Sequence, residues 1–350
     1  MEKTRIILAD TDYNYLAPLE LKFIEELNDE VQLEVITDRD YFKELFSKPQ
    51  NVDILVVSEG VYSPELRKHH ISCIFVLTEE ADTRAECGSG IIELFKYTST
   101  KEIYNGILSI AQGILQPSGK KAETTVILVY SPIGGCGKTT IALGISAALA
   151  TQYKKVLYID AECMNTFQHH MESPVFLSEG ICREFMYPSA DIYEQIKVTI
   201  QSEGFDYLPP FGFALSSLGI SFSVYEELIA AAKLSGEYDY IIIDTDSCFD
   251  DKKASLMACA DRILLLTGQN RASVYTVNTL MKNINHSNMG KYIFICNDFD
   301  PQRDNMLASN KIPLNFVVSG YVRHYDDMEN SSLPETGGKA DIQKIAFLIN

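Results

Sequence analysis

The chain has 350 residues, a length at which one hydrophobic core usually gives way to two domains. Its 30 basic and 48 acidic side chains give a formal net charge of -18, which opposes binding to nucleic-acid phosphates or anionic lipid and favours protein partners. It has no apolar run of about 18 residues that would span a bilayer, no N-terminal export signal, and eight cysteines without the spacing of a metal site. We therefore expect a cytoplasmic protein with reduced thiols.

Short apolar segments alternate with helical patterns over the first 115 residues. They predict strands at residues 5–9, 32–36, 52–57, 72–77 and 91–95. A closing helix is predicted over residues 101–115. This alternation is typical of a parallel sheet covered on both faces, so the segment is expected to form a doubly wound α/β domain of the flavodoxin-like kind.

Residues 116–123, QPSGKKAE, combine proline, glycine, serine and charge without periodicity, and they predict a linker. A second and larger α/β domain is predicted over residues 124–350. Its strands are expected at residues 125–130, 156–159, 240–243, 263–266, 292–296 and 316–318, with a short strand and turn at 207–210. Near the end of the chain Ile342, Ile345, Ala346 and Ile349 share one helical face, which favours a docked helix over a membrane-surface helix.

The segment TVILVYSPIGGCGKTTIALG reads as an apolar strand, a glycine-rich turn and a helix. Glycines let several backbone amides converge on a phosphate chain, and the helix N-terminus adds partial positive charge beside the ammonium of Lys138. The hydroxyl of Thr139 is placed to bind Mg²⁺. The pattern predicts an ATP and Mg²⁺ site whose contacting residues are Gly134, Gly135, Cys136, Gly137, Lys138, Thr139 and Thr140. Cys136 is interpreted as a small filler of the loop, although a thiol at a helix N-terminus can also be reactive.

This loop resembles the deviant Walker A ATPases, the group of the septum-site protein MinD and the partition ATPase ParA, whose pattern is K-G-G-x-G-K-T/S. The chain reads IGGCGKT, so Ile133 stands where that group has its first lysine. In that group the lysine reaches across a dimer to the nucleotide of the partner subunit. The resemblance therefore implies a homodimer with ATP held between its subunits, and the loss of the lysine predicts slow hydrolysis.

Two acids follow the strand predicted at 156–159. Asp160 and Glu162 stand where the group has D-x-D, and the second acid of that motif positions the attacking water. The resemblance thus assigns catalytic roles to Lys138, Asp160 and Glu162. The alternative is that these acids cap the end of a strand. The adjacent histidines His169 and His170 lack the spacing of metal ligands and are predicted to be exposed.

The string YDYIIIDTD resembles a Walker B strand that brings Asp244 to the metal, which it would hold through water. In the same string, Asp246 is interpreted as a solvated loop acid. Asn297 follows the strand predicted at 292–296 and matches the asparagine that these ATPases place against the edge of the adenine. A turn at the end of the strand is the alternative for Asn297.

The first domain resembles a response-regulator receiver. Asp10 and Asp12 end its first strand, and Thr78 and Lys96 match the hydroxyl and lysine positions of that family. Ser58, however, stands where a receiver has its phosphoaccepting aspartate. The resemblance implies an atypical receiver used for docking or dimerisation, with a generic flavodoxin-like domain as the alternative.

A receiver-like domain joined to a MinD/ParA-like ATPase is similar to the TadZ/CpaE family, the polar localisation factors of tight-adherence pilus assembly. That resemblance implies an ATP-dependent homodimer that recruits pilus or secretion components to a cell pole, with no specific nucleic-acid partner and at most indirect membrane contact. The alternatives are a partition or positioning ATPase of the ParA/MinD kind and a signalling ATPase regulated through a working receiver.

Overall fold

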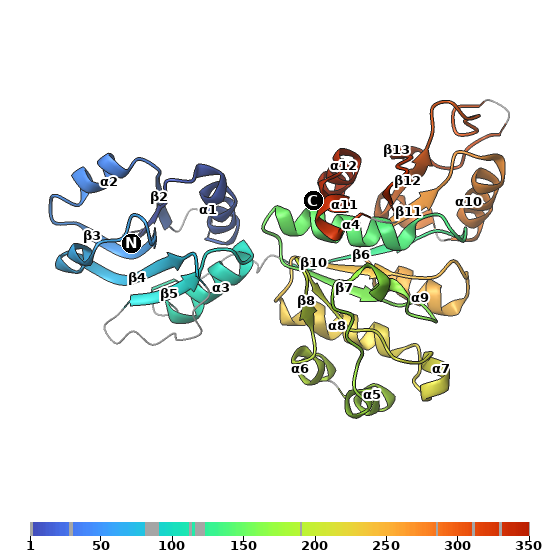
Figure 1. Cartoon of the computed structure of the whole chain (residues 1–350), viewed down its shortest axis with the longest axis horizontal. Helices are drawn as coiled ribbons and strands as arrows, with labels where there is room; N and C mark the ends of the chain where they lie inside the picture. Colours follow the sequence, from blue (N-terminus) through green and yellow to red (C-terminus); the bar gives the residue numbers. More distant parts are fainter. Residues whose placement is uncertain are drawn as a thin grey trace. The chain divides into compact units, whose positions relative to one another are not determined.

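The computed structural model describes residues 3–27, 31–80, 91–111, 114–115, 123–189, 191–284, 286–309, 312–328 and 331–349. Two compact units divide the chain (Figure 1): the first comprises Met1–Glu123 with Gln152–Lys154, and the second comprises Thr124–Thr151 with Lys155–Asn350. Apart from Glu123, the predicted linker at 116–123 lies outside the described residues. Among the described helices, none has the length and apolar character needed to cross a membrane.

The first unit is built on a five-stranded parallel sheet with the order β2-β1-β3-β4-β5, which is the flavodoxin-like order. Its strands are β1 (Thr4–Ala9), β2 (Val31–Ile36), β3 (Asn51–Ser58), β4 (His70–Thr78) and β5 (Ile91–Phe95). All of the strands predicted in this part of the chain are confirmed.

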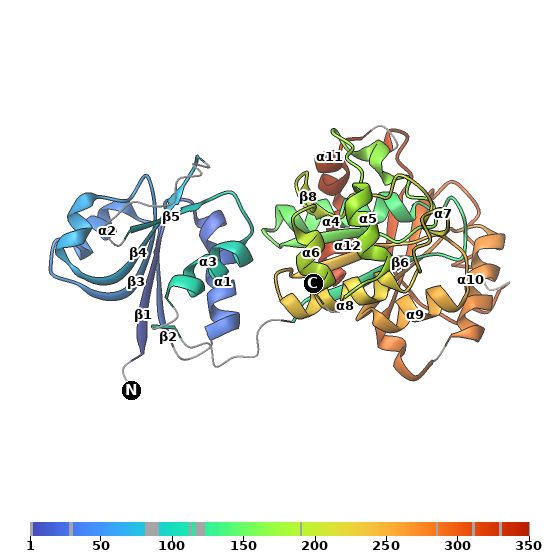
Figure 2. The ribbon, with the colours of Figure 1, turned by 90° about the horizontal axis from the view of Figure 1, so that it is seen from below.

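Helices cover both faces of this first sheet (Figure 2). Helices α1 (Tyr13–Leu27) and α3 (Thr100–Ile110) pack on one face, and α2 (Arg39–Leu45) and the 3₁₀ helix η2 (Pro64–Lys68) pack on the other. The prediction that the last helix continues to residue 115 is wrong. It ends at Ile110, because Ala111 is its C-cap: the N–H of Ala111 still bonds to the carbonyl oxygen of Ile107, but its ψ of 17° leaves the helical range.

The second unit contains an eight-stranded sheet with the order β13-β12-β11-β6-β10-β7-β9-β8. All neighbouring strands are parallel except β8 and β9. The strands are β6 (Thr125–Tyr130), β7 (Val156–Asp160), β8 (Gln201–Ser202), β9 (Asp206–Tyr207), β10 (Tyr240–Asp244), β11 (Arg262–Thr267), β12 (Tyr292–Phe299) and β13 (Val318–Arg323).

Two strand predictions in this unit require correction. The strand predicted at 316–318 begins only at Val318, since Phe316 instead stacks on Phe294 with 4.8 Å between ring centroids. The edge strand β13 is partly exposed and alternates in burial, so it has no continuous apolar run to mark it. The strand predicted at 207–210 is β9, which stops at Tyr207 because the prolines at 209 and 210 have no N–H to donate.

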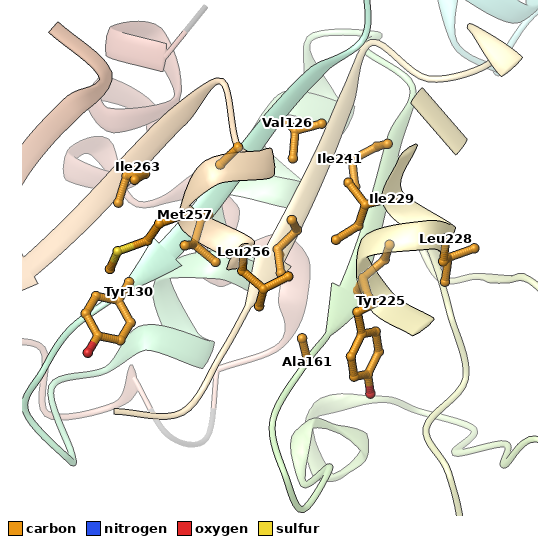
Figure 3. Close-up of a cluster of buried hydrophobic side chains, with 14 of the residues drawn as sticks. Val126, Tyr130, Ala161, Tyr225, Leu228, Ile229, Ile241, Leu256, Met257 and Ile263 are labelled. Atoms are coloured by element: carbon orange, nitrogen blue, oxygen red, sulfur yellow. The ribbon is translucent and has the colours of Figure 1, made fainter. Parts of the chain in front are cut away.

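Helices cover both faces of the second sheet. They are α4 (Lys138–Thr151), η3 (Phe167–His170), α5 (Glu179–Met186), α6 (Ile192–Lys197), α7 (Leu215–Leu218), α8 (Val224–Ser235), α9 (Asp251–Cys259), α10 (Arg271–Asn283), η4 (His286–Lys291), α11 (Leu333–Gly338) and α12 (Ala340–Ile349). Helices α4 and α12 pack on one face, and α5, α6, α8, α9 and α10 pack on the other. Figure 3 shows the second face, where Ile229 of α8 and Leu256 of α9 lie over Val126 and Ile241.

The apolar face predicted for the last helix is buried against α4 and the sheet. The docked alternative is therefore correct for α12. In the sheet itself, β6 lies between β10 and β11, and β10 lies between β6 and β7. The parallel register places Asp244 of β10 directly beside Asp160 of β7 and Val129 of β6. The carboxyl edge of the sheet thus brings the two acids next to the loop that follows β6.

Candidate functional site

The glycine-rich loop between β6 and α4 adopts the backbone that its sequence predicts. Gly135 and Gly137 have φ values of +68° and +77°, in the left-handed region that only glycine enters at low cost. The side chain of Asn297, a residue within β12, donates from Nδ2 to the carbonyl oxygen of Cys136 at 3.0 Å. A Cβ added at Gly137 would collide with this amide. Asn297 therefore lies against the loop and holds its shape.

Lys138 begins α4 and is 8% exposed. Its ammonium group donates to the hydroxyl of Ser247 at 2.8 Å. Ser247 belongs to the loop after β10 and was not predicted, since a serine three residues after a strand-end aspartate has no distinctive spacing. The lysine is thus held at the carboxyl edge by a neutral partner that it can exchange for a phosphate oxygen.

Asp244 ends β10 and has no exposed surface. Its carboxylate accepts hydrogen bonds from the hydroxyl of Tyr158 at 3.1 Å and from the N–H of Thr245 at 2.9 Å. Burial raises the pKa of Asp244 to about 7, while a hydrogen bond from Thr139 lowers it. A buried carboxylate beside a hydroxyl offers the oxygen ligands that Mg²⁺ prefers. A bound divalent cation would also offset the cost of burying the carboxylate, so these residues fit Mg²⁺. Tyr158 was not predicted as part of this group.

Asp160 is buried beside Asp244, and its carboxylate accepts the N–H of Glu162 at 2.8 Å. Burial, followed by the nearby charge of Asp244, raises its pKa well above the usual range. Glu162 is half-buried, and burial raises its pKa while Lys138 lowers it. Asp160 thus shapes the turn after β7, and Glu162 is the acid of this pair that reaches the site.

Asp246 is a loop acid as predicted, with a side chain that is 26% exposed, but it is not free in solvent. Its carboxylate forms an ion pair with the ammonium of Lys253 in α9 at 3.2 Å, and the Lys253 side chain is only 1% exposed. Lys253 also lies over the ring of Phe222, 4.7 Å from its centroid. The sequence could not show this, because a lysine in the first turn of a helix is normally solvated.

A cavity of about 550 Å³ opens at this edge of the sheet. It is lined by Gly135, Cys136, Gly137, Lys138, Thr139, Thr140, Glu162, Thr166, His169 and His170. The cavity thus unites the predicted loop with Glu162. Asp160, Asp244 and Asn297 are not among the lining residues, but Asp160 bonds to Glu162 and Asn297 bonds to Cys136, both of which line the cavity. Burial raises the pKa of the Cys136 thiol, which agrees with a loop filler more than with a reactive group.

The two histidines were missed as members of the site. Sequence reasoning predicted them to be exposed, which is wrong for His170, a half-buried residue that lines the cavity together with His169. The signal that could have located them is their place in the segment that follows Glu162, at the same edge of the sheet.

Comparisons with known proteins agree with this geometry. Residues 124–295 match the sequence model of an AAA domain family. The septum site-determining protein MinD of Synechocystis is 24% identical over 225 residues, covering 64% of this chain and 79% of that protein. An uncharacterized ATP-binding protein of Methanocaldococcus jannaschii is 26% identical over 150 residues, 40% of this chain and 52% of that protein. A ParA family ATPase structure from Chlorobium tepidum has a TM-score of 0.55 at 19% identity, covering 66% of this chain and 100% of its own.

Proposed function

We propose a function from one premise: the second unit of this chain is a P-loop ATPase domain of the MinD/ParA type. The chain binds ATP with Mg²⁺ at the loop of residues 134–140. The observation that carries this proposal is the grouping of Lys138, held by Ser247, with Thr139 beside the buried carboxylate of Asp244. Lys138 takes the phosphate oxygens in place of Ser247, and Thr139 and Asp244 hold the metal, Asp244 through water.

Hydrolysis, where it occurs, uses the acids after β7. Bound Mg²⁺ would neutralise charge on the phosphates as it develops. Glu162 lines the cavity and holds the attacking water, and Asp160 positions Glu162 through its backbone N–H. Position 133 carries an uncharged isoleucine, partly buried against the chain's own core, so it has no ammonium group to offer to a neighbouring nucleotide. The reaction is therefore slow, and the nucleotide acts mainly as a switch for dimerisation.

The first unit serves docking or dimerisation as an atypical receiver. Its flavodoxin-like strand order supports this assignment. At the carboxyl edge of that sheet, Lys96 forms a buried ion pair with Asp10 at 2.6 Å. Ser58 is also buried and offers a hydroxyl where a receiver has a carboxylate. Because Lys96 already pairs with Asp10, and Ser58 stands at the acceptor position, we expect that phosphorylation of an aspartate does not switch this unit.

With both units, the chain acts as a TadZ/CpaE-like factor. As a cytoplasmic homodimer it recruits tight-adherence pilus or secretion proteins to a cell pole. The domain pairing supports this role, and the net charge of -18 disfavours the runner-up, a DNA-partition ATPase. A more general version of this proposal is that the chain positions a different assembly in the cell, as the name of its MinD relative suggests.

The switch can be tested by sedimentation of the full chain. With Mg²⁺ and a non-hydrolysable ATP analogue the chain should sediment as a dimer, and with ADP as a monomer, because ATP-specific contacts favour the paired state. An unchanged sedimentation coefficient in all nucleotide states would refute the switch.

The cellular role needs its own test. A fluorescent fusion of the full chain, made in cells that assemble the pilus, should form polar foci, and the Lys138→Ala fusion should be diffuse. Diffuse fluorescence of both proteins would refute the proposed role at the pole, but it would not contradict the proposed ATP site.

A further inference from the structure

We propose that His169 and His170 form the wall of the site against the terminal phosphate of ATP, and that they make the chain distinguish ATP from ADP. The inference rests on the proposed binding of ATP. It assigns to this pair the contact with the terminal phosphate that position 133 does not supply.

The two imidazoles are held at the cavity by the residues around them. Phe167 begins η3 and is fully buried, with its ring 5.0 Å from that of Tyr158 and 5.8 Å from that of Tyr207. Met171, directly after His170, is also buried. His169 is bonded through Nδ1 to the carbonyl oxygen of Thr166. Because η3 is anchored at both ends, its histidines form a fixed part of the cavity lining.

The sheet order places the pair on the side of the metal. β6, which carries the loop, is flanked by β10 and β11. On the β10 side lie Asp244 and, one strand further, the end of β7 with Glu162 and η3. On the β11 side lies β12, which ends near Asn297. A nucleotide whose metal is held by Thr139 and Asp244 therefore directs its terminal phosphate toward Glu162 and the histidines.

The charged side chains that line the cavity include few groups that could bind a terminal phosphate. Among the described residues that line it, Lys138 of α4 is the fixed cation and Glu162 is the fixed anion. Just beyond η3, Glu203 accepts the N–H groups of Glu172 and Ser173. The terminal phosphate of ATP thus enters a site with one lysine and an acid. Besides the backbone amides and hydroxyls of the loop, the imidazoles are the lining side chains that can donate an N–H to that phosphate.

The rings themselves are suited to a bound anion. Their centroids are 3.8 Å apart and the planes are tilted by 40°. Burial, followed by the neighbouring His169, lowers the pKa of His170, which favours the neutral ring when no anion is bound. A phosphate beside the pair would favour the protonated form of His170 and gain an ionic hydrogen bond.

Affinities for two nucleotides test the inference. The wild-type chain and the variant His169→Ala/His170→Ala are titrated with Mg·ADP and with a non-hydrolysable Mg·ATP analogue. We expect the variant to lose about tenfold or more in affinity for the ATP analogue, as for loss of an ionic hydrogen bond, and to bind ADP as the wild type does. The variant His170→Arg should keep the preference for the ATP analogue, since it keeps a donor at the same place.

A matched control exists in the first unit. His69 caps η2 and His70 begins β4, both in the first unit, and His69→Ala/His70→Ala should keep wild-type affinities for both nucleotides. The variant His169→Gln/His170→Gln serves where alanine lowers the melting temperature. If the His169 and His170 variants keep the wild-type ratio of the two affinities, the inference is wrong and the proposed function stands. If the wild-type chain binds neither nucleotide, the proposed function fails as well.

Discussion

Replacing Gly137 with alanine tests how the loop is shaped. The residue has a φ of +77°, and a left-handed conformation costs a non-glycine residue about 1–2 kcal/mol. The new Cβ would also displace the amide of Asn297, whose 3.0 Å hydrogen bond to the Cys136 carbonyl is worth about 1 kcal/mol. We expect Gly137→Ala to lower the free energy of unfolding of the second unit by about 2–3 kcal/mol.

A double-mutant cycle separates the two contributions. On a background of Asn297→Ala the collision is absent, so Gly137→Ala should then cost only the conformational part. Gly134→Ala is the control for stability, because its Cβ meets no atom within 4 Å. Urea unfolding of the full chain, with hydrogen exchange of β6 and α4 amides to report on the second unit, measures each corner of the cycle. An equal cost of Gly137→Ala on both backgrounds would refute the described contact.

Three further predictions concern charge. Asp246→Asn leaves Lys253 buried without its ion-pair partner and should lower the free energy of unfolding by about 3 kcal/mol. Asp246→Asn/Lys253→Met should recover most of this loss. If urea unfolding finds the single variant as stable as the wild type, the ion pair does not stabilise the fold. Burial raises the pKa of Asp244 from 3.8 to about 7, so the folded chain holds a proton that the unfolded chain releases, and the metal-free protein should lose stability as pH rises through this window. With a chelator present, Asp244→Asn should make the free energy of unfolding less dependent on pH in this range. If the dependence on pH is unchanged, the proton is bound by another group. Ile133→Lys should speed ATP hydrolysis in a phosphate-release assay, and an unchanged rate would show that the missing lysine does not limit it.

The sequence predicted the parts of the fold that follow from local pattern. The apolar runs of β6 and β10 are buried on both faces, so they are marked by residue type alone. The edge strand β13 packs on one side only, and its start was placed two residues too early at Phe316. Likewise, α12 was recognised because its apolar residues repeat with the period of a helix.

The candidate site divides in the same way. The loop from Gly134 to Thr139 could be predicted because phosphate binding requires glycines, a lysine and a hydroxyl at fixed spacing. Ser247, Tyr158 and the His169 and His170 pair reach the site through the alignment of separate strands, and their own residue types carry no signal. The ion pair of Asp246 was missed because Lys253 meets it only when α9 packs on the sheet.

Calorimetric titration of the full chain with Mg·ATP measures the central proposal directly, that Lys138 and Thr139 grip a triphosphate with its metal. The account predicts saturable heat for the wild-type chain at one site per chain, and none for Lys138→Ala, whose fold should remain intact by circular dichroism. Equal binding by the Lys138→Ala chain, or no heat from the wild-type chain, would contradict it.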